Sequence, residues 1–288
     1  MNLEELKKYQ SLDGKVAIVT GASRAHGQGL AIAKSLAIRG AKVCITDLPG
    51  DDARYNFEGL GVGSTAELEA AVEQITALGT EAMCCAFDVT DKAEIKRCVD
   101  EVLDQWERID ILVNNAGSLH GGKIEDLTDE LWDSAYKVNM KALSDFAAAV
   151  LPTMKEMGEG VIINNTSIAG IQAFLGTGCY TATKHGAVGI TRVMADEFGQ
   201  YNIRVNAICP GNVWTDISQR EAELLAEWGT VEKPKDAVQM MKDMAVLGDR
   251  YVMPEDIGEA AAFLACPSSS FITGITLRVD GGLKGMLG

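Results

Sequence analysis

A tyrosine and a lysine stand four residues apart in the stretch YTATK, at Tyr180 and Lys184. If this stretch is helical, the two side chains share one face of the helix. An ammonium group near a phenol favours the phenolate, so we expect the pKa of the phenol to be lowered toward neutral pH. A phenol with such a pKa can exchange a proton with an alcohol. The spacing alone is weak evidence, because it also arises by chance.

The stretch TGASRAHGQG, residues 20–29, carries the glycines Gly21, Gly27 and Gly29 between an apolar run and a segment of helical spacing. Glycines in a strand-to-helix turn let the backbone approach a pyrophosphate, and the helix N-terminus offers free N–H groups. Asp47 ends the next apolar run, where a carboxylate can accept both hydroxyls of an adenosine ribose and repels a 2′-phosphate. The sequence therefore predicts a dinucleotide site that prefers NAD, and Arg24 inside the turn keeps NADP as the alternative.

Short β-branched runs alternate along the chain with segments of helical spacing. The runs cover residues 15–20, 42–46, 81–87, 109–113, 160–166, 203–208 and 275–279, and the helical segments cover 30–37, 66–78, 92–106, 129–157, 182–200 and 254–265. This alternation predicts an α/β fold, a Rossmann-type doubly wound parallel sheet of about seven strands, in a single domain over residues 1–288. The segments 48–65 and 212–253 interrupt the pattern, and long segments of this kind are usually functional or disordered.

The composition excludes some partners. Lys and Arg total 26 against 41 Asp and Glu, and a net charge of −15 argues against nucleic acid or an anionic membrane as partner. No apolar run approaches the roughly 20 residues of a membrane span, and the N-terminal stretch lacks a signal-peptide core, so we expect a cytoplasmic protein that acts on small molecules.

The seven cysteines form no CxxC pair and lie mostly in apolar runs, which predicts reduced, buried thiols. The three histidines are far apart, so no metal site is predicted.

Taken together, these features resemble the short-chain dehydrogenase/reductase family from Lys15 to about Gly282. The matching stretches are the glycine turn at 20–29, DV at 88–89, NNAG at 114–117, VNM around Asn139, Ser167, YTATK at 180–184, PGNVWT at 210–215 and VDGG at 279–282. Ser167 precedes Tyr180 by 180 − 167 = 13 residues, as is usual in the family. The resemblance implies hydride transfer between NAD(H) and a secondary alcohol or its ketone, and a homo-oligomer, either a dimer or a tetramer.

The resemblance also assigns roles to residues. Tyr180 would be the general acid and base, Lys184 would lower its pKa and hold the nicotinamide ribose, Ser167 would bind the substrate oxygen, and Asn139 would support a proton-relaying water chain. The cofactor-binding residues implied are Gly21, Ser23, Arg24, Gly27, Gly29, Asp47, Asp88, Val89, Asn115, Ala116, Gly117, Tyr180, Lys184, Pro210, Gly211, Val213 and Thr215.

Two departures from the family pattern stand out. Five residues separate the first two glycines, giving TGxxxxxGxG where the family has TGxxxGxG, so the contacts of the stretched turn are not fixed by the resemblance. The insertion at 48–65 follows Asp47 directly and is similar to insertions in an actinobacterial subgroup thought to hold NAD without releasing it. We hypothesise that the insertion folds over the adenosine half of the cofactor and slows its exchange; a surface loop without a role is the alternative.

The substrate is expected to be a bulky hydrophobic secondary alcohol such as a steroid, terpenoid or cyclic alcohol. Its binding surface would include residues 168–170 and 174–175 and a lid at 212–253, whose Trp214, Met240, Met241 and Met244 are apolar and adaptable. An alternative is an NAD-binding regulatory or redox protein with a poorly exchanging cofactor, which would not need the four catalytic residues. An extended-family epimerase or dehydratase would need a larger C-terminal domain than the 288 − 211 = 77 residues that follow Gly211.

Overall fold

The computed structural model describes residues 3–50, 64–216, 218–229, 231–248 and 250–284. Seven parallel strands form one sheet in the order β3-β2-β1-β4-β5-β6-β7. The strands are β1 (Val16–Thr20), β2 (Lys42–Asp47), β3 (Ala82–Ala86), β4 (Ile111–Asn114), β5 (Gly160–Asn165), β6 (Ile203–Pro210) and β7 (Thr276–Val279). The chain passes from β1 outward to β3 and then returns to β4 on the other side of β1. This reversal confirms the Rossmann-type fold and opens a crevice at the carboxyl ends of β1 and β4.

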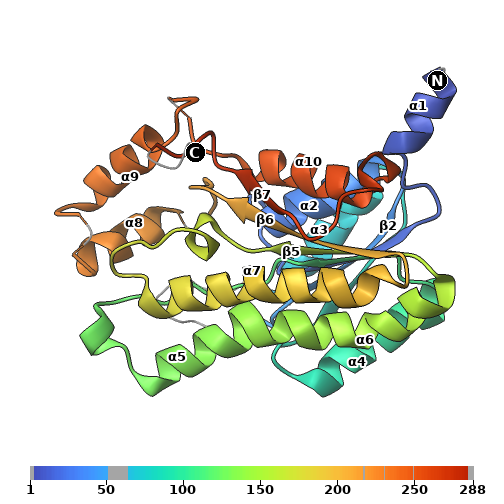
Figure 1. Cartoon of the computed structure of the whole chain (residues 1–288), viewed down its shortest axis with the longest axis horizontal. Helices are drawn as coiled ribbons and strands as arrows, with labels where there is room; N and C mark the ends of the chain where they lie inside the picture. Colours follow the sequence, from blue (N-terminus) through green and yellow to red (C-terminus); the bar gives the residue numbers. More distant parts are fainter. Residues whose placement is uncertain (1–2, 51–63, 217, 230, 249, 285–288) are drawn as a thin grey trace.

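Helices cover both faces of the sheet (Figure 1). One face carries α2 (Gln28–Ile38), α3 (Thr65–Thr76) and α10 (Pro254–Ala265), which pack on the sheet in one apolar core. The other face carries α4 (Lys92–Trp106), α6 (Ala142–Met157) and α7 (Gly178–Gly199) around a second apolar core. The helix α1 (Leu3–Gln10) precedes β1. Of the helices described, none combines the length and apolar character needed to cross a bilayer.

The single helix predicted over 129–157 is interrupted. The structure has α5 (Asp129–Tyr136), a π-helical turn over Lys137–Lys141, and then α6. Asn139 lies in that wider turn and is fully buried. π-Helical turns inside α-helices occur mostly at functional sites. The position of Asn139 in such a turn therefore supports the functional role expected for it from the sequence.

Asp110 holds the amino ends of the central strands together. Its carboxylate accepts a hydrogen bond from the backbone N–H of Val16 at 2.9 Å and another from Arg108 Nε at 2.8 Å, and Lys15 Nζ lies 3.1 Å from it. Its side chain is only 4% exposed. Burial alone would raise the pKa of Asp110, but Arg108, the N–H of Val16 and Lys15 together lower the pKa below its ordinary value.

We predict that Asp110→Asn lowers the free energy of unfolding by about 2–4 kcal/mol near neutral pH, because it leaves Arg108 and Lys15 with a weaker partner at a buried position. The folded-state pKa is lowered, so the stabilisation is present above the ordinary carboxyl pKa and is lost as the pH falls through the folded-state value. Urea unfolding at neutral and acidic pH measures this difference.

The matched control is Asp100→Asn on α4, where the carboxylate is about half exposed and pairs with Lys96 on the surface. That change should cost less than about 0.5 kcal/mol. Equal effects of the two substitutions at neutral pH would contradict the role given to Asp110.

Candidate active site

The glycine turn between β1 and α2 is held close to the end of β4. Gly21 has a φ of +67°, and a Cβ there would lie 2.8 Å from the Cα of Ala116. A Cβ on Gly29 would lie 2.2 Å from the carbonyl oxygen of Gly21. Both positions therefore require glycine, since the backbone of the turn leaves no space for a side chain.

The side chain of Asn115 fixes this turn. Its Nδ2 donates to the carbonyl oxygens of Thr20 and Gly21, both at 2.8 Å, and its Oδ1 accepts from Asn165 Nδ2 at 2.8 Å. Asn165 Nδ2 also donates to Gln28 Oε1 at 2.9 Å. The family resemblance makes Asn115 a cofactor-binding residue. The structure gives its side chain a further role, because it ties the ends of β1, β4 and β5 together.

The stretched part of the turn binds Asp47. The backbone N–H and the hydroxyl of Ser23 both donate to Asp47 Oδ2, at 2.9 and 2.6 Å. The N–H of Leu48 donates to the other carboxylate oxygen at 2.8 Å. Three residues on, His26 donates its backbone N–H to Asp216 Oδ2 at 3.0 Å, and its ring Nδ1 lies 2.8 Å from Asp216 Oδ1. The longer turn thus orients the expected ribose-binding carboxylate and contacts the segment 212–253.

Ser167, Tyr180 and Lys184 lie together, as the sequence predicted. Ser167 follows β5, and its hydroxyl accepts a hydrogen bond from the N–H of Ala169 at 3.0 Å. Tyr180 and Lys184 occupy the first two turns of α7, and Lys184 Nζ lies 5.5 Å from the centre of the Tyr180 ring. The Ser167 hydroxyl lies close enough to the Tyr180 phenol to lower its pKa. A hydroxyl pair of this kind can hold one oxygen atom of a substrate and exchange a proton with it.

The electrostatics of this group differ from the expectation. Burial raises the pKa of Tyr180 to about 12, against the opposing effect of the nearby Ser167 hydroxyl. Burial also lowers the pKa of Lys184 to about 8. The prediction that the ammonium lowers the phenol pKa is therefore wrong for this structure, because loss of solvent disfavours the charged form of both groups.

Asn139 and Gly117 lie next to Lys184 and complete the group that it forms with Ser167 and Tyr180. Asn139 exchanges two hydrogen bonds of 2.8 Å with the backbone of Ser118, as donor to its carbonyl oxygen and as acceptor from its N–H. A Cβ on Gly117 would lie 3.2 Å from Lys184 Nζ and 3.3 Å from Asn139 Oδ1. The loop after β4 is thus fixed against the catalytic residues by the π-helical turn.

The remaining predicted residues lie at the same edge of the sheet. Asp88 and Val89 follow β3, Pro210 ends β6, and Gly211, Val213 and Thr215 come directly after it. All the predicted site residues therefore gather at the carboxyl ends of the strands, where open α/β sheets bind their ligands.

The residues present fit a dinucleotide. Among the described residues, the buried atoms Ser118 Oγ, Thr46 Oγ1 and Asn165 Oδ1 have no hydrogen-bond partner, and all three belong to residues at or just after the carboxyl ends of strands. A glycine turn at a helix N-terminus, a fixed carboxylate at Asp47 and unsatisfied polar atoms at this edge match the phosphate, ribose and amide groups of such a ligand.

The segment 212–253 covers this edge. It contains α8 (Ser218–Glu227) and α9 (Pro234–Asp243), which lie beyond the carboxyl ends of the strands (Figure 1). The Trp228 ring lies against Gly121, where an added Cβ would be 2.7 Å from it. The rings of Trp214 and Tyr251 pack against each other, with centres 4.7 Å apart and planes tilted by 42°. The predicted lid therefore has helical structure and packs on the loop that follows β4.

Glu221 on α8 is a site residue that the sequence analysis missed. Burial raises its pKa to about 7, and nearby Arg24 acts in the opposite direction. The charge of Glu221 also contributes to the raised pKa of Tyr180. In the sequence this glutamate stands among the surface charges Arg220 and Glu223, so nothing in the pattern distinguished it.

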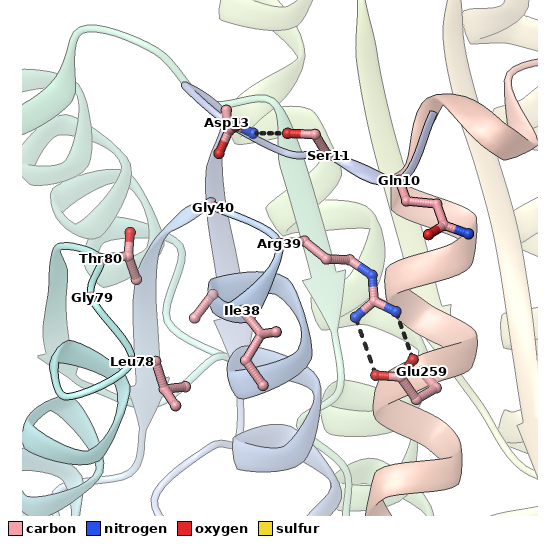
Figure 2. A pocket seen from close by; sticks show the side chains of 11 residues that line it. Gln10, Ser11, Asp13, Ile38, Arg39, Gly40, Leu78, Gly79, Thr80 and Glu259 are labelled. Carbon is pink, nitrogen blue, oxygen red and sulfur yellow. Dashed lines mark hydrogen bonds and ion pairs between the residues drawn. The ribbon is translucent and has the colours of Figure 1, made fainter. Parts of the chain in front are cut away.

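A surface pocket of about 720 Å³ lies away from these residues (Figure 2). It is lined by the segments that precede β1, β2 and β3, so it opens at the amino ends of the strands. Arg39 and Glu259 form a two-point ion pair at its side, with the shorter contact at 2.6 Å. Cavity size therefore does not locate the candidate active site, which is identified by its chemistry.

Comparisons with known proteins agree with this geometry. A family model described as enoyl-(acyl carrier protein) reductase matches residues 21–284. A 3-oxoacyl-[acyl-carrier-protein] reductase from Thermotoga maritima is 33% identical over 272 residues, which are 94% of this chain and 98% of that protein.

Two solved structures are also similar. A carveol dehydrogenase from Mycobacterium avium in complex with NAD is 31% identical, with a TM-score of 0.86 over 94% of this chain and 98% of that one. An L-sorbose reductase from Gluconobacter frateurii, complexed with NADPH and L-sorbose, is 28% identical, with a TM-score of 0.84 over 97% of this chain and all of that one.

We predict that Glu221→Gln makes the stability of the protein less dependent on pH. The pKa of Glu221 in the folded protein is about 7, above its ordinary value of 4.5. The folded protein therefore binds more protons than the unfolded one between these values, and the free energy of unfolding falls as the pH rises through about 7.

Because glutamine resembles the neutral acid, the variant should melt at least about 2 °C above the wild type at pH 8 and close to it at pH 5, as measured by thermal unfolding. Glu223→Gln on the same helix, which removes only a surface pair with Arg220, is the control and should show no such trend. A melting temperature of Glu221→Gln that stays equal to that of the wild type at both pH values would contradict the raised pKa of Glu221.

Proposed function

The chain belongs to the short-chain dehydrogenase/reductase family, and on that basis we propose that it is an NAD-dependent dehydrogenase or ketoreductase for secondary alcohols and ketones. The observation that carries the proposal is the grouping of Ser167 beside Tyr180, with Lys184 one helical turn along the same face of α7. These three residues stand beside a glycine turn suited to a dinucleotide.

The cofactor would lie along the carboxyl edge of the sheet. The N–H groups of the glycine turn and the N-terminus of α2 would hold the pyrophosphate, and Asp47 would hold the adenosine ribose. Lys184 would hold the nicotinamide ribose, and Val213 and Thr215 would lie near the carboxamide. When bound, the nicotinamide ring supplies the hydride acceptor or donor.

The protein's own contribution is to bind the reacting oxygen and move its proton. The hydroxyls of Ser167 and Tyr180 would bind the oxygen of the alcohol or ketone, and the proton would pass between that oxygen and the phenol oxygen of Tyr180. With a pKa of about 12, Tyr180 is suited to donate this proton to a forming alkoxide. In the direction of alcohol oxidation, a charged Lys184 would stabilise the phenolate that accepts the proton.

The geometry of Asp47 supports NAD over NADP. Its carboxylate is fixed by two hydrogen bonds from Ser23 and one from Leu48, so it cannot turn away from a ribose placed against it without losing them. A 2′-phosphate at that position would meet a negative charge at close range. The solved neighbours include complexes with NAD and with NADPH, so the preference rests on Asp47 itself.

The proposed substrate is a bulky hydrophobic secondary alcohol or ketone, such as a steroid, terpenoid or cyclic compound. We propose that the segment 212–253 acts as the lid. The proposal is supported by its paired aromatic rings, Trp214 and Tyr251, and by its partly buried methionines, Met240, Met241 and Met244. The similarity to a carveol dehydrogenase points the same way. Most of the insertion at 48–65 lies outside the described residues, and slow cofactor exchange through it stays a proposal.

We also propose a homo-oligomer, either a dimer or a tetramer. The aromatic side chains of Phe263 on α10 and Phe271 in the segment before β7 are 42% and 104% exposed, and exposed aromatic side chains are typical of protein–protein contacts. A second copy of the chain would cover them.

We predict that Tyr180→Phe lowers kcat by at least about 100-fold, because it removes the group that exchanges the substrate proton while leaving the ring in place. The measurement is NADH formation by absorbance with a panel of aliphatic, cyclic, terpenoid and steroidal secondary alcohols. Tyr136→Phe, at a tyrosine that is 42% exposed on α5, is the control and should retain the wild-type rate. Turnover by Tyr180→Phe at the wild-type rate would exclude the proposed mechanism.

We predict that Asp47→Ser shifts the ratio of kcat/KM for NAD to that for NADP toward NADP by at least about tenfold, or about 1.4 kcal/mol, because it removes the charge that repels the 2′-phosphate. Steady-state kinetics with both cofactors measure the ratio. Asp104→Asn on the surface of α4 serves as the control, since it removes one negative charge away from the site. An unchanged ratio in Asp47→Ser would show that another residue reads the ribose.

A further inference from the structure

Three cysteines from separate elements meet inside the protein, away from the candidate active site. They are Cys44 on β2, Cys85 on β3 and Cys98 on α4, and their Sγ atoms all lie within 4.8 Å of one another. The Sγ atoms of Cys44 and Cys85 are 3.9 Å apart. The three residues are 0%, 3% and 0% exposed. Their separation along the sequence gave no sign of this thiol cluster.

The pairing of the strands explains how the thiols come together. In the parallel register of β2 and β3, Thr46 lies opposite Cys85, so Cys44 stands two residues earlier on the same face of the sheet. That face packs against α4, which contributes Cys98. Cys84 is next to Cys85 but packs on the other face, so it does not belong to the thiol cluster.

The spacing of the thiols matches the coordination geometry of a metal ion. Around a tetrahedral ion with metal–sulfur bonds of about 2.3 Å, neighbouring sulfurs lie about 3.8 Å apart. The distance of 3.9 Å between Cys44 and Cys85 agrees with this value. Soft thiolate ligands select thiophilic ions such as Zn²⁺ and Cu⁺ over Mg²⁺ and Ca²⁺.

A carboxylate stands at the edge of the thiol cluster. Glu101 Oε2 lies 3.3 Å from Cys85 Sγ, and Arg97 holds the other oxygen of Glu101 at 2.6 Å. The side chain of Glu101 is 41% exposed, so it joins the buried thiols to solvent. It offers an oxygen ligand next to Cys85.

We propose that Cys44, Cys85 and Cys98 bind a thiophilic metal ion as three thiolates. Binding of a divalent ion releases three thiol protons to solvent and leaves a complex with one net negative charge, with no change in the oxidation state of sulfur or metal. The ion links β2, β3 and α4. β2 ends at Asp47, and Asp88 follows β3. The bound ion therefore also stabilises the edge of the sheet that carries the expected adenosine contacts.

The test uses the full-length wild-type protein, reduced, treated with a chelator and titrated with Cd²⁺ in the absence of oxygen. We expect ultraviolet sulfur-to-cadmium charge-transfer absorption that saturates at a single equivalent and is reversed by competing Zn²⁺. Alkylation of the loaded protein followed by peptide mapping should show that Cys44, Cys85 and Cys98 are protected together. Absence of the absorption, or protection of other cysteines instead, would overturn the proposal.

Two variants separate the thiol cluster from general thiol binding. Cys98→Ala should weaken Cd²⁺ binding at least about tenfold, since it removes one of three ligands. Cys84→Ala, on the same strand as Cys85 but on the opposite face, should bind as the wild type does. Equal losses in the two variants would contradict the assignment. If Cys98→Ala does not fold, as judged by circular dichroism, the protection map of the wild type decides the question.

Discussion

The side-chain amide of Asn115 ties together the carboxyl ends of three strands, and the candidate site depends on that tie. It donates to two carbonyl oxygens at the end of β1 and accepts from Asn165 at the end of β5. The glycine turn can then pass so close to β4 that neither Gly21 nor Gly29 has space for a Cβ. The backbone N–H groups of Asn115 and Ala116 support the same arrangement, since both donate to the Thr20 hydroxyl at 2.9 Å.

Burial sets the chemistry that the site can perform. Burial shifts both Tyr180 and Lys184 toward their neutral forms, raising the pKa of the phenol and lowering the pKa of the ammonium. The phenolate of Tyr180 and the ammonium of Lys184 are both disfavoured unless a bound ligand supplies polar contacts to them. Ligand binding and proton transfer are therefore coupled. Asn139 and Ser118 keep the neighbouring loop in place while this occurs, through hydrogen bonds that do not depend on either ionisable group.

Local patterns predicted much of the fold. The bounds of α4 and α10 are those expected from helical spacing, and the runs of β-branched residues became the strands of one parallel sheet. Parallel topology then brings the ends of all strands to one edge, where Ser167, Tyr180 and Asp47, which the family resemblance had grouped as site residues, lie.

Contacts between distant segments could not be predicted from the sequence. The bonds from Ser23 to Asp47, from His26 to Asp216 and from Asn139 to Ser118 depend on how loops meet in space. For the same reason Glu221 was missed and the direction of the Tyr180 pKa shift was wrong. The thiol cluster also follows from strand register, which no local spacing records.

The central claim is that the substrate gives up a hydride directly while the protein moves only the proton. It is tested by following deuterium from a secondary alcohol labelled at the carbinol carbon, with the best substrate of the panel and with NAD, using proton NMR of the reduced cofactor. The account predicts that the label appears quantitatively at C4 of the nicotinamide and that none reaches solvent. Label that exchanges into water, or a product that forms without reduction of NAD, would contradict it.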